Sequence, residues 1–167
     1  MRRIALIGCP GAGKTTLARA LGDQLDLPVI HLDRHFWKPG WVETPREPWQ
    51  KHQKKLLSGD RWIVDGGYHA TLDIRLPRAD TVLCFDFPRW RSYWGVARRW
   101  MQHHGQTRPD LGEGCPERLD PEFLRYIWNF PRDIRPKVFD KVAQYRDGKR
   151  VEVFRAPLDV RRFVAAL

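Results

Sequence analysis

The sequence predicts an α/β fold in which helices cover both faces of a parallel β-sheet. Short apolar runs typical of buried strands alternate along the chain with segments of helical periodicity, and this order favours parallel strands joined by helices. The chain has 167 residues, of which 42% are hydrophobic, enough for one domain with a sizeable core. We therefore expect a single domain over residues 1–167.

The first predicted strand, Ile4–Ile7, is followed by a glycine-rich loop. From Gly8 to Thr15 this loop has the spacing G-x-x-x-x-G-K-T, which is the pattern of a phosphate-binding P-loop. A helical pattern over residues 13–25 follows, so the motif lies between a strand and a helix, as a P-loop requires. Glycines let backbone N–H groups converge on an anion, and the helix N-terminus adds the positive end of its dipole. The segment predicts a nucleotide-binding site.

The residue types of this loop predict how ATP and Mg²⁺ would be held. The Lys14 amine would reach the β- and γ-phosphates, and the Thr15 hydroxyl would coordinate Mg²⁺. The residues expected to bind the nucleotide are Gly8, Gly11, Ala12, Gly13, Lys14, Thr15 and Thr16. A P-loop by itself does not distinguish a kinase from an ATPase, a GTPase or a motor.

An aspartate ends each of the next two predicted strands. Leu27–Leu32 is expected to form the second strand and is followed by Asp33, and the third strand begins at Arg61 and ends at Asp65. Acids at these strand ends face the ligand crevice of an open α/β sheet. Asp33 is expected to accept a proton from a substrate hydroxyl group or to hold Mg²⁺ through water, with a turn or helix cap as the structural alternative. Asp65 is expected to orient Mg²⁺ as a Walker B acid.

The segment between these two strands is unusually aromatic. Residues 34–41 are expected to form a loop whose aromatic side chains either cover a core or line a substrate pocket. These side chains are Phe36, Trp37 and Trp41. His31, within the second strand, is assigned to packing. Thr44–Glu47 fits a capping box with proline at the first helical position, and a helix is predicted from there to about Leu57.

The fourth predicted strand, Thr81–Asp86, also ends in an acid. Asp86 is an alternative Walker B residue, but we interpret it as a structural residue, and we expect Asp86 or its neighbours to cap the following helix. That helix is predicted from Arg89 to Met101. Its apolar positions fall at helical spacing and are expected to form a buried face: Trp90, Trp94, Ala97 and Met101. The arginines of the same helix lie on other faces: Arg91, Arg98 and Arg99.

The next segment, residues 103–119, has no periodicity and contains several glycines and prolines among charged residues. A loop of this length between two helical segments is typical of a lid. We therefore expect a lid at about residues 102–120. Asp120 and Pro121 form a typical helix start that ends it.

The helix that begins there is interrupted by two prolines, Pro131 and Pro136, which must break or kink it. Two arginines between them, Arg132 and Arg135, would either clamp transferring phosphates or pair with acids on the sheet. A fifth strand is predicted at 151–154, and residues 160–167 have the spacing of an amphipathic closing helix.

The composition limits the cellular context and the partners. The net charge of +10 is compatible with nucleic-acid binding and equally with an arginine-lined cleft that handles phosphates. The three cysteines form no pairing pattern, which favours a reducing cytosol, and we expect a cytoplasmic protein. No apolar run approaches the length of a membrane span, so no membrane partner is expected.

This layout resembles the adenylate-kinase-like family of small P-loop kinases across the whole chain. Several stretches are also similar to the bacterial "DNA topology modulation protein" group of that family, whose name refers to a phenotype. These stretches are His31–Asp33 with the Trp37/Trp41 loop, Asp65–Tyr68, Thr71–Leu76 and Arg108–Leu111.

The resemblance implies a P-loop NTPase fold with three α/β/α layers, a five-stranded parallel sheet and a small mobile lid. It also implies Mg-ATP as the phosphoryl donor. By position, Asp65 matches the family's acid after strand three, and Arg98 or Arg99 matches the lid-base arginine that contacts ATP. Arg132 and Arg135 lie where lid-side arginines of the family reach the transferring phosphate.

The sequence departs from the family pattern at the acceptor side. Adenylate kinases follow the strand-three Asp-Gly with a Phe-Pro-Arg stretch that helps to hold the monophosphate, whereas this chain has Asp65-Gly66-Gly67-Tyr68-His69. The aromatic loop after Asp33 also differs from the usual monophosphate-binding helix. An acid such as Asp33 suits a hydroxyl acceptor, as in nucleoside, shikimate or gluconate kinases.

The sequence therefore predicts a Mg-ATP-dependent phosphotransferase that acts on a small-molecule acceptor. Its expected catalytic residues are Lys14, Asp33, Arg98, Arg99, Arg132 and Arg135, and its expected metal ligands are Thr15 and Asp65. The alternative is a nucleic-acid-associated P-loop ATPase or a regulatory nucleotide-binding protein. The chain is expected to be a monomer or a dimer.

Overall fold

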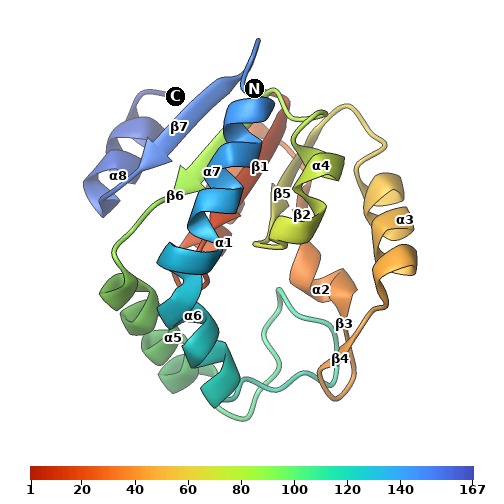
Figure 1. Ribbon diagram of the computed structural model, residues 1–167, viewed down its shortest axis with the longest axis vertical. Helices are drawn as coiled ribbons and strands as arrows, with labels where there is room; N and C mark the ends of the chain where they lie inside the picture. The colour runs from red at the N-terminus through yellow and green to blue at the C-terminus, as the bar shows by residue number, and fades with distance from the viewer.

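A computed structural model describes residues Met1–Leu167, and its centre is a sheet of parallel strands between layers of helices (Figure 1). The five strands follow the order β2-β5-β1-β6-β7. Their bounds are β1 (Arg3–Gly8), β2 (Val29–His31), β5 (Trp62–Asp65), β6 (Thr81–Phe85) and β7 (Arg150–Phe154). Every neighbouring pair is parallel, which confirms the predicted five-stranded sheet.

Alternating side chains of β1 pack into two different cores, because successive residues of a strand point to opposite faces of the sheet. Ala5 and Ile7 join one core, and Ile4 and Leu6 join the other. All four are fully buried. This burial on both faces explains why β1 is an unbroken apolar run, and it confirms the three-layer α/β/α architecture.

Different helices cover the two faces of the sheet. On one face lie α1 (Lys14–Leu25) and α8 (Pro157–Ala165), which bury Leu21 and Phe163. On the other face lie α3 (Arg46–Leu56), α4 (Leu72–Arg75) and α7 (Arg135–Gln144). A short 3₁₀ turn, η1 (His69–Thr71), leads into α4. None of the helices is both long and apolar enough to span a lipid bilayer.

The aromatic segment after β2 is not the predicted loop. It forms the short helix α2 (Leu32–Phe36) and an antiparallel hairpin of β3 (Trp37–Lys38) and β4 (Val42–Glu43). The strand β2 is correspondingly shorter than predicted, and Asp33 lies in the first turn of α2. The turn of the hairpin contains consecutive left-handed residues, Gly40 and Trp41, with φ angles of 77° and 63°.

The predicted capping box before α3 is also wrong. The Thr44 hydroxyl donates a hydrogen bond of 2.6 Å to the carbonyl oxygen of Phe36, so it is not available to cap α3. Pro45 occupies the cap position, and α3 begins at Arg46. The Thr44 hydroxyl therefore bonds to the backbone of α2 instead of capping α3.

Two further helices extend beyond the sheet at its carboxyl end, α5 (Arg89–His103) and α6 (Pro121–Asp133). The Asp120 carboxylate accepts a hydrogen bond from the Glu122 amide, as the predicted helix start requires. The predicted break lies at Ile134, between α6 and α7, whereas Pro131 remains inside α6.

The expected buried face of α5 is wrong. The exposed fractions of Trp90, Trp94 and Met101 are 61%, 59% and 61%. The helix is instead buried through Ser92 and Val96, the second of which packs against α6. Helical spacing identifies side chains that share a face, but it does not show which face a neighbouring helix covers.

Candidate active site

The glycines of the P-loop are required by its conformation. Gly11 and Gly13 have φ angles of 76° and 93°, in the left-handed region that favours glycine. A Cβ atom on Gly8 would meet the backbone of Phe85, and one on Gly11 would meet the carbonyl oxygen of Ser92. Gly13 caps α1 without any side-chain hydrogen bond, so the first N–H groups of this helix remain available to an anion.

The Lys14 side chain folds back over this loop. Its Nζ atom donates a hydrogen bond of 2.8 Å to the carbonyl oxygen of Cys9. Lys14 is buried, and burial lowers the pKa of its amine, although the negative charge of Asp65 acts in the opposite direction. The lysine therefore lies inside the anion-binding loop, next to a carboxylate.

Asp65 ends β5 beside the P-loop strand and is bonded to two side chains. The Thr15 hydroxyl donates a hydrogen bond of 2.6 Å to its carboxylate, and the His31 Nδ1 atom lies 3.2 Å from the same oxygen. Burial disfavours the charged form of Asp65, but these two hydrogen bonds and the Lys14 amine hold its pKa below the ordinary value. His31, which the sequence assigned to packing, therefore contacts the carboxylate of the predicted metal ligand Asp65.

This donor set fits a magnesium ion. A hydroxyl oxygen and an ionised carboxylate, already in contact beside a lysine and a glycine-rich loop, are the hard oxygen ligands that Mg²⁺ binds next to phosphates. The other Walker B candidate, Asp86, has a different partner, because both of its oxygens accept hydrogen bonds from Arg135 at 2.6 and 2.7 Å.

Asp33 is bonded to Tyr68, whose hydroxyl donates a hydrogen bond of 2.7 Å to its carboxylate. Burial raises the pKa of Asp33, and the negative charge of Asp65 raises it further, against the opposite effects of Tyr68 and of the Arg108 and Lys14 charges. The site thus holds two neighbouring carboxylates whose pKa values move in opposite directions. Such a pair separates a proton acceptor from a permanently charged group.

Arg75 fixes the turn that carries Tyr68. Its guanidinium is fully buried and donates hydrogen bonds to the carbonyl oxygens of Gly66, Gly67 and Tyr68 at 2.7, 2.6 and 3.1 Å. Burial lowers the pKa of Arg75 to about 10. The sequence analysis did not single out this residue, and its only sequence signal is an arginine between two apolar residues, Ile74 and Leu76.

The structure assigns Phe36 to the first of the two roles that the sequence left open, which is to cover a core. Phe36 packs against Trp49 and Tyr68, with ring centroids 5.2 and 4.8 Å apart, and belongs to the core. Trp37 lies against Trp41, at a centroid distance of 5.3 Å. The indole N–H of Trp41 donates a hydrogen bond to the carbonyl oxygen of Pro116, in the segment between α5 and α6.

That segment, residues 104–120, is held by a chain of buried ion pairs. Glu117 lies 2.9 Å from Arg99 of α5 and 2.7 Å from Arg108. Arg108 also lies 2.8 Å from Asp110, which is 3.3 Å from Arg19 of α1. Arg108, Asp110 and Glu117 are each less than 10% exposed. Arg108, which the sequence analysis did not assign to the site, is close enough to Asp33 to oppose its rise in pKa.

The predicted arginines have different positions. Arg99 is close enough to Lys14 and Asp33 for its charge to interact with theirs. Arg98 is exposed, and Arg132 is bonded only to its neighbour Asp133, so neither makes a hydrogen bond to the other site residues. Arg135 pairs with Asp86 of the sheet, which is the second of the two roles expected from the sequence.

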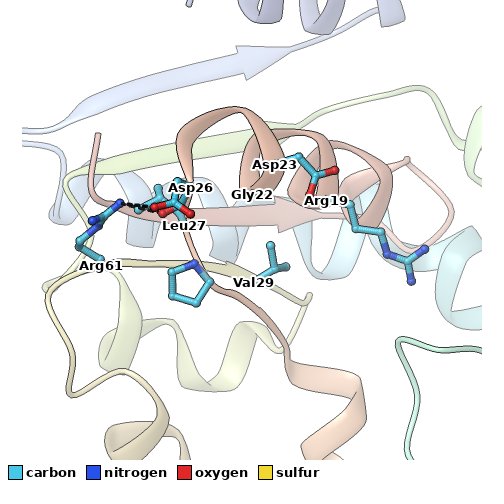
Figure 2. Close-up of a pocket in the computed structure, with 8 residues that line it drawn as sticks. Arg19, Gly22, Asp23, Asp26, Leu27, Val29 and Arg61 are labelled. Carbon is cyan, nitrogen blue, oxygen red and sulfur yellow. Dashed lines mark hydrogen bonds and ion pairs between the residues drawn. The ribbon is translucent and has the colours of Figure 1, made fainter.

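A hollow of about 590 Å³ lies at the other end of α1, away from the P-loop (Figure 2). Its wall includes Asp26, Val29 and Arg61, and the Arg61 guanidinium donates a hydrogen bond of 2.7 Å to the carbonyl oxygen of Asp26. None of the predicted site residues lines this hollow. The candidate active site is therefore the region around the P-loop.

The sequence of the chain matches no family model, and no curated protein matches it. Its structure is similar to solved kinases. A shikimate kinase from Acinetobacter baumannii has a TM-score of 0.58 and 18% identity, covering 99% of this chain and 90% of that one. A deoxyadenosine kinase from M. mycoides has a TM-score of 0.53 and 13% identity, covering 98% and 95%. A sugar kinase from Janibacter sp. has a TM-score of 0.52 and 15% identity, covering 99% and 93%. At these identities the likeness shows the fold, and the chain has the three-layer fold of small P-loop kinases.

Proposed function

We propose that the protein is a Mg-ATP-dependent phosphotransferase that moves the γ-phosphoryl group of ATP to a hydroxyl group of a small molecule. The observation that carries this proposal is the pair of carboxylates beside the P-loop. Asp65 is bonded to Thr15 and stays ionised, whereas Asp33 is bonded to Tyr68 and has a raised pKa. The ionised Asp65 carboxylate is suited to bind a metal ion, and the Asp33 carboxylate, with its raised pKa, is suited to accept a proton.

The P-loop residues bind the nucleotide. The N–H groups of residues 11–16 and the Lys14 amine hold the β- and γ-phosphates, and Thr15 and Asp65 hold the metal. A bound Mg²⁺ ion would neutralise charge on the β- and γ-phosphate oxygens. His31 keeps the Asp65 carboxylate in place through its Nδ1 contact.

Asp33 accepts the proton of the acceptor hydroxyl group. As the oxygen of that hydroxyl forms its bond to the γ-phosphorus, the bond from this phosphorus to the β,γ-bridging oxygen breaks, and the proton passes to the Asp33 carboxylate. A raised pKa makes a carboxylate a better proton acceptor near neutral pH. The Tyr68 hydroxyl orients the Asp33 carboxylate, and Arg75 fixes the turn that carries Tyr68.

Arg99 and Arg108 supply positive charge from the lid side. Both lie near Asp33 and share the carboxylate of Glu117. We propose that residues 102–120 act as a lid that brings Arg108 to the transferring phosphoryl group and excludes water. Charge stabilisation by a properly placed arginine is worth about 10³–10⁵ in rate.

The names of the structural neighbours support a hydroxyl acceptor, because shikimate, deoxyadenosine and sugars all carry hydroxyl groups. The test is an ATP-consumption assay with Mg²⁺ and a panel of nucleosides, nucleoside monophosphates, hydroxy acids and sugars. We expect one class to stimulate ADP formation and to yield a product heavier by one phosphoryl group. Hydrolysis that no acceptor stimulates would contradict the proposal.

A matched pair of variants separates donor from acceptor chemistry. Lys14→Ala should abolish ADP formation with every acceptor, because the lysine holds the phosphates. Arg161→Ala removes the same charge from the exposed side of α8 and should leave the rate within about twofold of wild type. Equal activity of Lys14→Ala and wild type would show that Lys14 does not take part in the reaction.

A further inference from the structure

The helix α5 presents an exposed strip of apolar side chains, which we call the Trp90 strip: Trp90, Trp94, Ala97 and Met101. With 100° of rotation per residue, these positions fall on one side of the helix. Trp90, Trp94 and Met101 are each more than half exposed. Contiguous exposed apolar surface of this kind is uncommon on a chain that functions alone and marks an interaction site. In Figure 1, α5 lies at the edge of the molecule, with α6 on its inner side.

The surroundings of the strip are cationic. The helix contains no aspartate or glutamate but carries four arginines: Arg89, Arg91, Arg98 and Arg99. Arg91 follows Trp90 directly and Arg98 lies one turn after Trp94, and both fall on the same edge of the strip. The whole chain has a net charge of +10. Since Arg99 is paired with Glu117, the free positive charge beside the strip comes from Arg91 and Arg98, and it favours an anionic partner.

Guanidinium groups lie against the aromatic rings here. The Arg91 guanidinium carbon is 5.4 Å from the Trp90 ring centroid, and that of Arg89 is 4.4 Å from the Trp128 ring centroid on α6. A hollow of about 570 Å³ lies among the side chains of Trp90, Arg91, Tyr93, Trp94 and Ala97. The surface thus offers flat π faces, cations beside them and a recess between them.

We propose that the Trp90 strip binds single-stranded nucleic acid, with unpaired bases stacked on Trp90 and Trp94 and backbone phosphates paired with Arg91 and Arg98. Stacking on aromatic side chains inside a positively charged groove is how sequence-tolerant single-strand binding works. A duplex keeps its bases stacked inside and cannot use the indole faces. The repulsion between two copies of charge +10 opposes self-association through this arginine-lined surface.

A fluorescence-anisotropy titration with labelled oligothymidylate of about 20 nucleotides tests the proposal. Wild-type protein should bind the single strand at low salt and bind a duplex of the same length more weakly. Trp90→Ala/Trp94→Ala should weaken single-strand binding about tenfold or more, because stacking contributes in this range for each base. Binding of both should weaken as salt rises, since counterions are released from the phosphates.

Two control variants separate stacking from general charge and general hydrophobicity. Leu158→Ala removes an apolar side chain that is half exposed on α8, and Arg161→Ala removes one charge from the same helix. Both should bind the oligonucleotide within about twofold of wild type, whereas Arg91→Ala should weaken binding more than Arg161→Ala does. If Arg91→Ala and Arg161→Ala lose the same oligonucleotide affinity, the binding depends only on the net charge of the protein, and the proposal is overturned.

Other partners of the Trp90 strip can be distinguished with the same wild-type and variant proteins. Absence of single-strand binding at low salt overturns the proposal, as does equal affinity of wild type and Trp90→Ala/Trp94→Ala. If no oligonucleotide binds, binding to vesicles that contain anionic phospholipid would assign the strip to a membrane surface. In the same case, a dimer in sedimentation that Trp90→Ala/Trp94→Ala abolishes would assign the strip to contact with a second copy of the chain. ATP consumption by the double variant should equal that of wild type, so the proposed phosphotransfer is tested separately.

Discussion

At the scale of single residues, the site depends on what surrounds two aspartates that lie near the same lysine. Asp65 accepts hydrogen bonds from Thr15 and His31, and these keep it charged. Asp33 is desolvated beside the negative charge of Asp65. The neighbours of the two aspartates thus move their pKa values in opposite directions, and each direction leads to a prediction.

Replacing Asp33 should raise stability and lower activity. The pKa of Asp33 is higher in the folded state than in the unfolded state, so its ionisation destabilises the fold at pH values above the unfolded pKa. At lower pH the carboxyl group is protonated in both states, and this destabilisation is absent. Asp33→Asn should therefore raise Tm at pH 7 by about 2–4 °C, the equivalent of about 1 kcal/mol in a domain of this size. The rise should vanish near pH 3. Thermal melts across pH measure this directly.

The same variant should lose about 10²- to 10⁴-fold in acceptor phosphorylation, because a general base is missing, while its ATP affinity stays within about threefold. In the wild type, the rate should fall as pH drops through the raised pKa of Asp33. Asp33→Asn with unchanged turnover, or with lower Tm at pH 7, would show that Asp33 is a structural residue.

Replacing Asp65 should have the opposite effect on stability. Its folded pKa lies below the ordinary value of 3.8, so the stability it contributes is present above that value and is lost as pH falls through the folded pKa. Asp65→Asn should lose about 1–3 kcal/mol at pH 7, since hydrogen bonds to a charged group are lost. Urea unfolding at pH 7 and pH 3 should show this difference shrinking at the lower pH.

Some of these residue roles could not be predicted from sequence. The P-loop glycines have a characteristic spacing, and Asp65 ends an apolar strand, so both were identified as candidates from the sequence. Tyr68, Arg75 and Arg108 form their contacts only after distant segments meet. The Arg108–Asp33 proximity, for example, depends on the path of the segment between α5 and α6, and nothing in the local pattern specifies that path.

At the scale of elements, the P-loop and α5 touch through two glycines. A Cβ atom on Gly95 would collide with the backbone of Gly11, and one on Gly11 would collide with the carbonyl oxygen of Ser92 in α5. The helix that leads to the segment 104–120 therefore packs directly on the P-loop. Movement of α5 must be accompanied by movement of this loop.

Gly95→Ala should test this contact. Overpacking of a close backbone contact costs about 1–3 kcal/mol, and the displaced P-loop should bind ATP about tenfold more weakly or worse. Gly59→Ala is the control, because no atom lies within 4 Å of a Cβ at that position. Denaturant melts and ATP titrations of the two variants should differ. Normal ATP affinity in Gly95→Ala would show that the loop tolerates displacement of α5.

The segment 104–120 should depend on Glu117 for its order. Glu117 is buried and lies between Arg99 and Arg108, so Glu117→Gln leaves two cations without their shared carboxylate, a change that costs about 3–5 kcal/mol in buried pairs. Hydrogen exchange of peptides from this segment should accelerate, while exchange in β1 and β6 stays unchanged. Glu122→Gln, at an exposed position of α6, should not alter exchange in the segment. Identical protection in both variants would contradict a role for this ion-pair chain.

At the scale of the whole molecule, the sequence predicts the architecture better than the surfaces. Strand runs such as Ile4–Ile7 are apolar because they are buried on both faces, so pattern alone finds them. The short helix α2 and the hairpin after it were missed, because they depend on long-range contacts of Phe36 with α3 and of Trp41 with the segment 104–120, in addition to contacts nearby in sequence. The α5 tryptophans were misplaced for the complementary reason, since no partner in the chain covers them.

Nucleotide binding should be visible in the stability of the whole fold. A ligand that binds only the folded state stabilises it by about 2.7 kcal/mol at a concentration of 100 Kd, which corresponds to a rise in Tm of about 5–10 °C for a domain of this size. The ATP analogue AMPPNP with Mg²⁺ should give this rise in a thermal-shift assay, and AMPPNP with EDTA a smaller one, since Thr15 and Asp65 then lack the metal. Lys14→Ala should lose the shift, measured against the Tm of the same variant without ligand, because the lysine is expected to hold the phosphates. A shift of equal size in Lys14→Ala would show that the nucleotide binds elsewhere on the molecule.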